Sequence, residues 1–181
     1  MDTMVVVEII VAIIVLAGVV AFAVWEARRR RRARLQQRFG PEYAREVETR
    51  GSERDAEQHL SGVADRRDQL DIQELEPAAR DGYTRRWEAV QAKFVDQPGS
   101  ALDEADRLVT DVMRDRGYPV DDFSERADLV AADHPQIVEH YRAAHAVQHA
   151  HHGGAGASDT EELRQAFVHY RALFNELVAG Q

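Results

Sequence analysis

The sequence predicts an all-α protein made of a transmembrane helix, a polar helical stalk and a compact bundle of about five helices. Three observations predict it. An apolar run, with Glu8 as its one charged residue, covers residues 4–25. Apolar residues recur every three or four positions through the second half of the chain, and no stretch alternates with the period of two that strands require. We expect an anchor with an arginine-rich collar over 1–34, a stalk over 35–75 and an acidic bundle over 76–181.

The apolar run from Met4 to Trp25 has the length of a membrane span. Its 22 residues form a helix of roughly 33 Å at about 1.5 Å per residue, and a hydrocarbon core is about 30 Å thick. Trp25 suits the interface between lipid and water. Glu8 lies close to the outer end of the run, so an interfacial carboxylate is a simpler interpretation than a functional acid inside the membrane.

The charges that flank this run predict its orientation. Arg28, Arg29, Arg30, Arg31, Arg32 and Arg34 follow it, and no Lys or Arg precedes it. Cations beside a span stay on the cytoplasmic side, so we expect a single-pass protein of the cell membrane with its N-terminus outside and its C-terminal domain in the cytoplasm. The alternative is a cleaved signal peptide, since Ala21-Phe22-Ala23 resembles a cleavage pattern. A signal peptide, however, carries its positive charge before the apolar segment.

The six arginines, here called the arginine collar, have two compatible interpretations. They set the orientation, and they bind anionic lipid headgroups at about 1 kcal/mol per cation. Removing these six, and the three acids before residue 35, from 23 cations and 32 acids leaves 17 cations and 29 acids, a net charge of −12 for residues 35–181. Phosphate backbones repel such an acidic body, so we expect no nucleic-acid partner. The absence of cysteine excludes disulfides and thiol-based metal sites.

The stalk is predicted to consist of polar helices. The anchor helix continues to about Phe39, where Gly40-Pro41 interrupts it. Ser52, followed three residues later by an acid, is typical of a helix start. Over residues 53–70 the apolar positions are sparse, so this helix is either a solvated spacer or one half of a coiled coil through which the chain forms a homo-oligomer.

The bundle is predicted from five apolar stripes. Pro77 fits the first turn of its first helix, and turns at Pro98-Gly99-Ser100 and Gly117-Tyr118-Pro119 end the first two. Asp133-His134-Pro135 begins the fourth helix, and Ser100 and Ser158 are interpreted as caps. The stripes are Tyr83, Trp87, Val90 and Phe94; Leu102, Ala105, Leu108, Val109, Val112 and Met113; Phe123, Ala127 and Val130; Ile137, Val138, Tyr141, Ala144 and Val147; and Leu163, Phe167, Tyr170, Phe174 and Leu177.

Five segments resemble a bacterial family, common in actinobacteria, of short proteins with one N-terminal span and a helical cytoplasmic body. They are LQQRFGPEY (35–43), RWEAVQAKFVDQP (86–98), EADRLVTDVMRDRGYPV (104–120), HPQIVEHYRAAH (134–145) and TEELRQAFVHYRALFNEL (160–177). The resemblance covers most of the chain beyond the anchor. It implies the architecture described above and no activity, because the family has no assigned reaction, ligand or catalytic residue.

Histidines form the one concentration of chemically active side chains, with six of the eight between His134 and His152. His145, His149 and His152 share a face if the helix persists, at a spacing that lets imidazoles converge on a divalent ion. The cluster has no cysteine or obvious carboxylate ligand and adjoins a glycine-rich segment. A solvated helix end is therefore the simpler interpretation, and a surface that charges as the pH falls through about 6.5 is a third.

Catalytic motifs are absent: there is no phosphate-binding glycine loop, no H-E-x-x-H and no G-x-S-x-G. We therefore expect no enzyme and no cofactor, but a membrane-tethered interaction or scaffold module for an unidentified cytoplasmic or membrane protein. The alternative is a domain that binds a small ligand or a metal ion, or that is an enzyme. Its site would be built on His134–His152 or on the region of Tyr118, Asp121 and Asp122. A deep cleft lined by buried histidines and carboxylates would favour that alternative.

Overall fold

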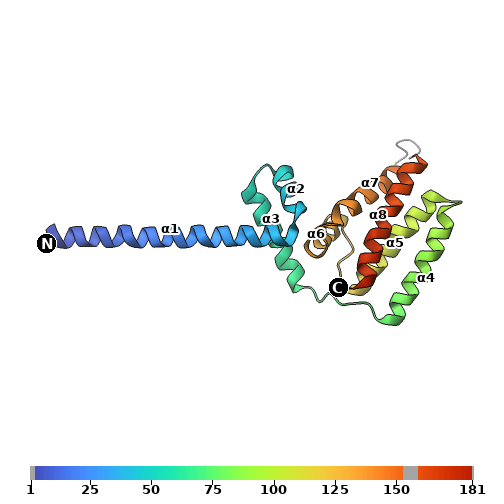
Figure 1. The fold of residues 1–181 in the computed structure, drawn as a ribbon, viewed down its shortest axis with the longest axis horizontal. Helices are drawn as coiled ribbons and strands as arrows, with labels where there is room; N and C mark the ends of the chain where they lie inside the picture. Colours follow the sequence, from blue (N-terminus) through green and yellow to red (C-terminus); the bar gives the residue numbers. More distant parts are fainter. Residues whose placement is uncertain (1–2, 153–158, 181) are drawn as a thin grey trace.

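The computed structural model describes residues 3–152 and 159–180, with side chains for 12–151 and 159–180. All regular structure in these residues is helical, which confirms the predicted all-α class (Figure 1). The eight helices described are α1 Thr3–Phe39, α2 Pro41–Arg50, α3 Glu53–Gln69, α4 Pro77–Phe94, α5 Pro98–Arg116, α6 Phe123–Asp133, α7 Val138–His152 and α8 Thr160–Ala179.

Helix α1 projects away from the rest of the molecule for most of its length (Figure 1). Its 37 residues extend about 55 Å at 1.5 Å per residue. The large apolar side chains from Ile13 to Trp25 are between 45% and 64% exposed. The helix ends at Phe39 because Gly40 adopts a φ of 49° and Pro41 begins the next helix.

The predicted transmembrane segment, residues 4–25, lies within α1, but its described part does not qualify as a span. Among the side chains that the structure describes, no helix is both long enough and apolar enough to cross a bilayer. The described apolar stretch begins at Ala12 and ends at Trp25, where Glu26 and Arg28 begin the charged part of the helix. The side chains of residues 4–11 of the predicted span lie outside the described residues.

The polar helices α2 and α3 pack against the body. This packing contradicts the solvated-spacer interpretation of residues 53–70. The face of α3 that carries Ala56, Leu60 and Val63 is buried, and α3 contacts α1, α2 and α6. Leu35 and Phe39 at the end of α1 belong to the same buried cluster. The sparse apolar residues of 53–70 therefore form a narrow contact within one chain. The apolar face that a coiled coil with a second chain would use is already covered.

The five helices α4–α8 form the bundle, as the stripes predict. Helix α5 is its central element, with contacts to α4, α7 and α8. Trp87 of α4 stacks between Phe167 and Phe174 of α8, with ring centroids 5.2 and 4.7 Å apart. Helix α5 ends at Arg116 and is capped by Gly117, whose φ is 98° and where a Cβ would lie 2.7 Å from the carbonyl oxygen of Asp71. Only glycine fits there.

One contiguous core runs from Leu35 to Val178 and joins α1–α3 to the bundle. Helix α6 connects the two groups, because it contacts α1, α3 and α7. The segment between α3 and α4 is also fastened to the bundle: Gln73 exchanges hydrogen bonds with Arg116, as its N–H donates to the Arg116 carbonyl at 2.9 Å and Arg116 Nε donates to its carbonyl at 3.1 Å. The division between 35–75 and 76–181 as separate domains stays a prediction.

The helix starts differ from the expected ones at three places. Ser52 does cap α3, accepting a hydrogen bond from the Asp55 N–H. Ser100, however, lies inside α5, which begins at Pro98. Helix α8 is capped by Asp159, and Ser158 lies outside the described residues. His134 ends α6 instead of starting α7, because Pro135 cannot donate the hydrogen bond that would continue the helix.

Candidate functional site

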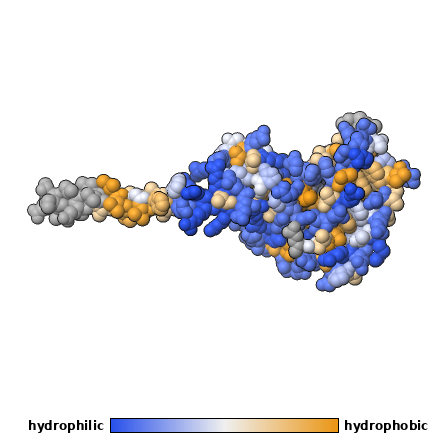
Figure 2. Space-filling view, in the orientation of Figure 1, coloured by the Kyte–Doolittle hydropathy of each residue, from blue (hydrophilic) through white to orange (hydrophobic). Residues whose placement is uncertain are grey.

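The arginine collar surrounds α1 between the apolar arm, defined as residues 12–25, and the body. Figure 2 shows the arm in orange next to the blue collar. Two collar arginines are held by acids: Arg30 donates to Glu26 at 2.7 Å, and Arg32 donates to both carboxylate oxygens of Glu53 at 2.8 and 2.5 Å. Arg29 lies over the Trp25 ring at 5.6 Å. The bond from Arg32 to Glu53 fixes the start of α3 beside the collar.

A cleft of about 500 Å³ lies where the collar meets the first turns of α3. We call it the collar cleft; it is lined by Arg28, Arg31, Glu53, Arg54, Glu57 and Gln58. Both acids in its wall have partners, since Glu53 binds Arg32 and Glu57 accepts a hydrogen bond from the Tyr43 hydroxyl at 3.0 Å. No ion pair or hydrogen bond engages the guanidinium groups of Arg28, Arg31 and Arg54 within the described part of the chain.

A smaller hollow of about 280 Å³ adjoins the collar cleft and shares Arg28 and Glu57 with it. Trp25, Arg29 and Arg32 complete its lining. The two hollows therefore form a continuous cationic surface that begins at the end of the apolar arm. Sequence reasoning found the collar but missed Arg54, because only the packing of α3 beside α1 brings this residue next to arginines more than twenty positions earlier.

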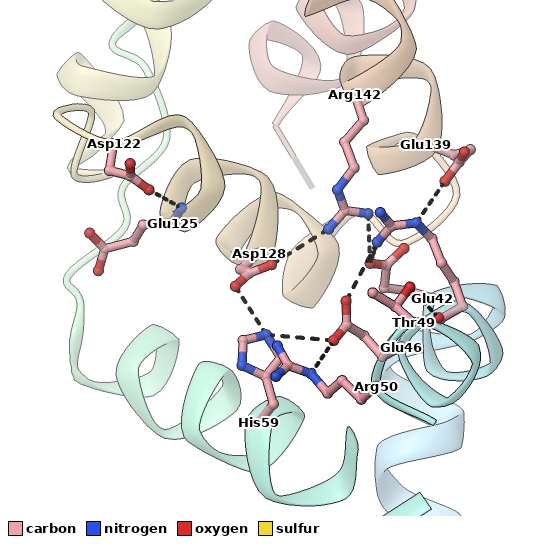
Figure 3. A network of polar contacts seen from close by, with 11 residues as sticks. Glu42, Glu46, Thr49, Arg50, His59, Asp122, Glu125, Asp128, Glu139 and Arg142 are labelled. Carbon is pink, nitrogen blue, oxygen red and sulfur yellow. Dashed lines mark hydrogen bonds and ion pairs between the residues drawn. The ribbon is translucent and has the colours of Figure 1, made fainter. Parts of the chain in front are cut away.

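A buried ionic network fastens α2 to the bundle (Figure 3). Glu42 and Glu46 of α2 are only 3% and 5% exposed. Glu42 accepts hydrogen bonds from Arg45 at 2.9 Å and from Arg142 of α7 at 2.6 Å. Glu46 accepts one from Arg50 at 2.6 Å. Buried carboxylates require such partners, and these partners hold α2 in one position on α7.

Two further residues extend this network to α3 and α6. Asp128 of α6 lies 3.1 Å from His59 of α3 and 3.5 Å from Arg142. Figure 3 shows these side chains converging between the four helices. No local pattern in the sequence predicts the network, because residues that are in contact within it are separated by up to 100 positions. We interpret it as the structural joint between α1–α3 and the bundle.

The two histidines of the candidate metal site whose side chains are described do not converge on a common point. The His145 ring stacks on Phe123, with centroids 3.5 Å apart. Its ring is parallel to that of His149 at 6.2 Å. The side chain of His152 lies outside the described residues. Burial lowers the pKa of His145 below its usual 6.5, so this imidazole favours the neutral form.

The other clustered histidines are dispersed over the bundle. His134 is buried with its Nδ1 3.2 Å from Glu176, and His151 packs against Gly99. His140 lies beside His169 of α8, with ring centroids 4.6 Å apart, a pair that only the packing of α7 on α8 reveals. Within the residues whose side chains are described, no group of three or more His, Asp or Glu is arranged to hold a metal ion.

The region of Tyr118, Asp121 and Asp122 does not assemble into a reactive site. Tyr118 is buried and donates to Asp133 at 2.5 Å, and burial raises its pKa above the usual 10. Asp122 caps α6 by accepting a hydrogen bond from the Glu125 N–H at 2.8 Å. Asp121 is exposed. Each of these side chains thus lies in a different environment, and the two engaged ones stabilise the fold.

An apolar groove of about 450 Å³ runs between α7 and α8. Its lining is rich in small side chains, which include Ala143, Ala146, Ala150 and Ala166, and it also contains His169. Glu161 and Glu162 also line it. Because the groove is lined by small side chains, it offers a surface that a helix or an extended peptide can contact closely.

Comparisons with known proteins give no relative for this chain: no protein-family model matches it, and neither a curated protein nor a solved structure is significantly similar to it. The resemblance to the single-span bacterial family therefore stays a prediction.

Proposed function

We propose that this chain is a membrane-tethered helical interaction module. The observation that carries the proposal is the exposure of the apolar arm. Nine large side chains between Ile13 and Trp25 are about half or more exposed. Burial of one such side chain is worth on the order of 1.5–3 kcal/mol, so the arm is strongly favoured to be covered. A contiguous apolar surface of this kind marks a contact with a membrane or another protein.

The arginine collar favours a membrane as this cover. The apolar arm ends at Trp25 and the first unpaired arginine is Arg28, so an interfacial indole and headgroup-binding cations follow in the order that a bilayer requires. We propose that the complete apolar segment, residues 4–25, crosses the membrane with the N-terminus outside. The acidic body then lies in the cytoplasm.

The body supports the role of an interaction module for a cytoplasmic or membrane protein. Residues 35–181 carry a net charge of −12, which disfavours close contact with an anionic leaflet. The groove between α7 and α8 is an apolar surface on the body. Tethering confines the partner search to the membrane and raises the effective concentration, so that even a weak contact becomes useful.

The tether is tested with the full-length chain expressed in bacteria and carrying a reporter after residue 181. We expect the protein to sediment with membranes, to resist extraction by alkaline carbonate and to be released by detergent. A reporter that is active only in the cytoplasm should be active, and one that is active only outside should be silent. Release by carbonate, or the opposite reporter pattern, would contradict the proposal.

A further inference from the structure

We propose that the collar cleft is a specific site for the phosphate group of an anionic phospholipid headgroup, in which Arg54 of α3 acts together with Arg28 and Arg31 of α1. This inference rests on the proposed membrane tether and names the ligand of the surface beside it. A general attraction between collar and leaflet requires only arginines on α1. A site that includes Arg54 requires the fold.

The charges around the cleft favour an anion. The three unpaired arginines line it against the two acids Glu53 and Glu57, and Arg32, which lines the adjoining hollow, neutralises Glu53. Glu53 has both carboxylate oxygens engaged by Arg32, and Glu57 accepts from Tyr43. The local charge is therefore positive. Unpaired guanidinium groups bind phosphate oxygens with two parallel hydrogen bonds.

The position of the cleft along α1 matches the headgroup layer. Arg28 and Arg31 lie three and six residues beyond Trp25, which is about 4.5 and 9 Å along a helix axis. The headgroup layer is roughly 5–8 Å thick on each side of the hydrocarbon core. With Trp25 at the edge of the hydrocarbon core, the backbone of Arg28 lies within this layer and that of Arg31 just beyond it, so both long side chains can reach lipid phosphates.

The contact between Arg32 and Glu53 positions the third arginine. Ser52 caps α3 and fixes its first residue, and the two hydrogen bonds from Arg32 hold Glu53 against α1. Arg54 is the next residue, it is exposed, and it lines the same cleft as Arg28 and Arg31. Arg54 lies too far from the predicted span in the sequence to help set the orientation of the protein in the membrane. A contribution of Arg54 to lipid binding would therefore be separate from that role.

The test compares arginine variants of the full-length protein in detergent micelles that contain phosphatidylcholine and a small fraction of phosphatidylglycerol. Native mass spectrometry counts the lipids retained by each protein. We expect the parent chain to retain phosphatidylglycerol preferentially. Arg54→Gln should lower this preference about fivefold, as expected for the loss of one cation near an anionic headgroup, and Arg28→Gln combined with Arg31→Gln should lower it further.

Two matched controls separate a site from diffuse attraction. Arg66 is an exposed arginine on α3 and Arg34 is one on α1; neither lines the cleft. Arg66→Gln should retain the parental preference, and Arg34→Gln, which removes a collar cation outside the cleft, should lower it less than Arg54→Gln does. All single variants should keep the parental melting temperature, because none of these side chains has an ion pair in the described structure. If Arg34→Gln weakens retention as much as Arg54→Gln, the proposed site is wrong.

A soluble anion is distinguished by a separate arm of the experiment. If inorganic phosphate binds to the protein in micelles free of anionic lipid, with the same dependence on Arg54, the ligand is a free anion and the lipid assignment is overturned. Failure of the membrane proposal has a different signature, which is release of the full-length protein by carbonate. A protein that stays in membranes while Arg54→Gln behaves like Arg66→Gln contradicts only the headgroup site.

Discussion

Tyr141 and Tyr170 face the same buried region with opposite consequences for stability. The Tyr170 hydroxyl donates to Asp106 at 2.9 Å, whereas the Tyr141 hydroxyl is buried and makes no hydrogen bond with any residue that the structure describes. Burial raises the pKa of both phenols above the usual 10. A buried polar group without a partner opposes folding, and one that binds a carboxylate supports it.

This difference predicts opposite effects of removing the two hydroxyl groups. Tyr170→Phe should lower the free energy of unfolding by about 1.5 kcal/mol, because a hydrogen bond to a charged group is lost. Tyr141→Phe should raise it by up to about 1 kcal/mol, because the unpaired hydroxyl no longer has to be desolvated. Urea denaturation of the full-length protein in detergent, followed by near-ultraviolet circular dichroism, measures both. Equal destabilisation by the two variants would show that Tyr141 is hydrogen-bonded.

The lowered pKa of His145 leads to a prediction of how the stability of the protein depends on pH between about 5.5 and 7.5. Burial lowers its pKa in the folded state below 6.5; the charge of Asp106 partly opposes this shift, and Arg126 and His149 add to it. The unfolded chain then binds the proton more readily, so the free energy of unfolding falls as the pH drops through 6.5 toward the lower folded-state value. His169 has a pKa lowered by burial as well and acts in the same direction.

The measurement is the melting temperature of the parent chain and of His145→Gln across this pH range. The parent should lose stability on acidification, and the variant should show a smaller loss, because glutamine does not titrate. The change of slope is the decisive quantity, since the variant also loses the stacking of His145 on Phe123. An unchanged slope would mean that His145 keeps an ordinary pKa.

At the scale of elements, α3 shows how few apolar residues suffice to dock a helix. Leu60 is 2% exposed and Val63 is 1% exposed, although the residues around them are mostly charged or polar. A solvated spacer would tolerate substitution at these positions. A docked helix would not, because a cavity in a packed core costs both transfer energy and lost contacts.

Leu60→Ala therefore distinguishes the two interpretations. We expect it to lower the free energy of unfolding by about 2–5 kcal/mol, the range for a leucine buried in a core. Gln58→Ala on the same helix, at an exposed position, should have little effect. Hydrogen exchange of α2 and α3 should become faster in Leu60→Ala alone. A loss below about 0.5 kcal/mol, typical of surface sites, would restore the spacer interpretation.

At the scale of the whole molecule, the ionic network determines how α1–α3 sit on the bundle. Arg142 contributes to it from α7, with its side chain 16% exposed, and its partner Glu42 is 3% exposed. Removing one member of a buried pair leaves a charge without its compensation. Arg45 also binds Glu42, so part of the compensation remains.

We expect Arg142→Gln to lower the free energy of unfolding by about 2 kcal/mol, below the roughly 3–5 kcal/mol of a fully buried pair that loses its only partner. Arg164→Gln is the matched control, because Arg164 pairs with Glu161 on the exposed face of α8; it should leave the unfolding transition unchanged. Limited proteolysis between α3 and α4 should be faster in Arg142→Gln. Equal proteolysis of the parent and Arg142→Gln would contradict a role for the network as a joint.

Prediction from the sequence succeeded where the signal is local. The helical class, the break at Gly40-Pro41, the cap at Ser52 and the apolar stripes of the bundle follow from spacing and from turn chemistry within a few residues. The arginine collar also follows, because it is one continuous run. The starts of α5 at Pro98 and of α7 at Val138 differ from the expected ones by a few residues, because more than one nearby residue can begin a helix.

The sequence by itself determined that this chain is helical, that it has an apolar segment beside a cationic collar, and which face of each bundle helix is buried, because periodicity and composition act through neighbours in the chain. Only the tertiary structure decided that α3 docks instead of standing free, that the clustered histidines disperse, and that Arg54 joins Arg28 and Arg31. These outcomes depend on contacts between residues tens of positions apart. No local pattern encodes such contacts, since they arise from the packing of whole helices.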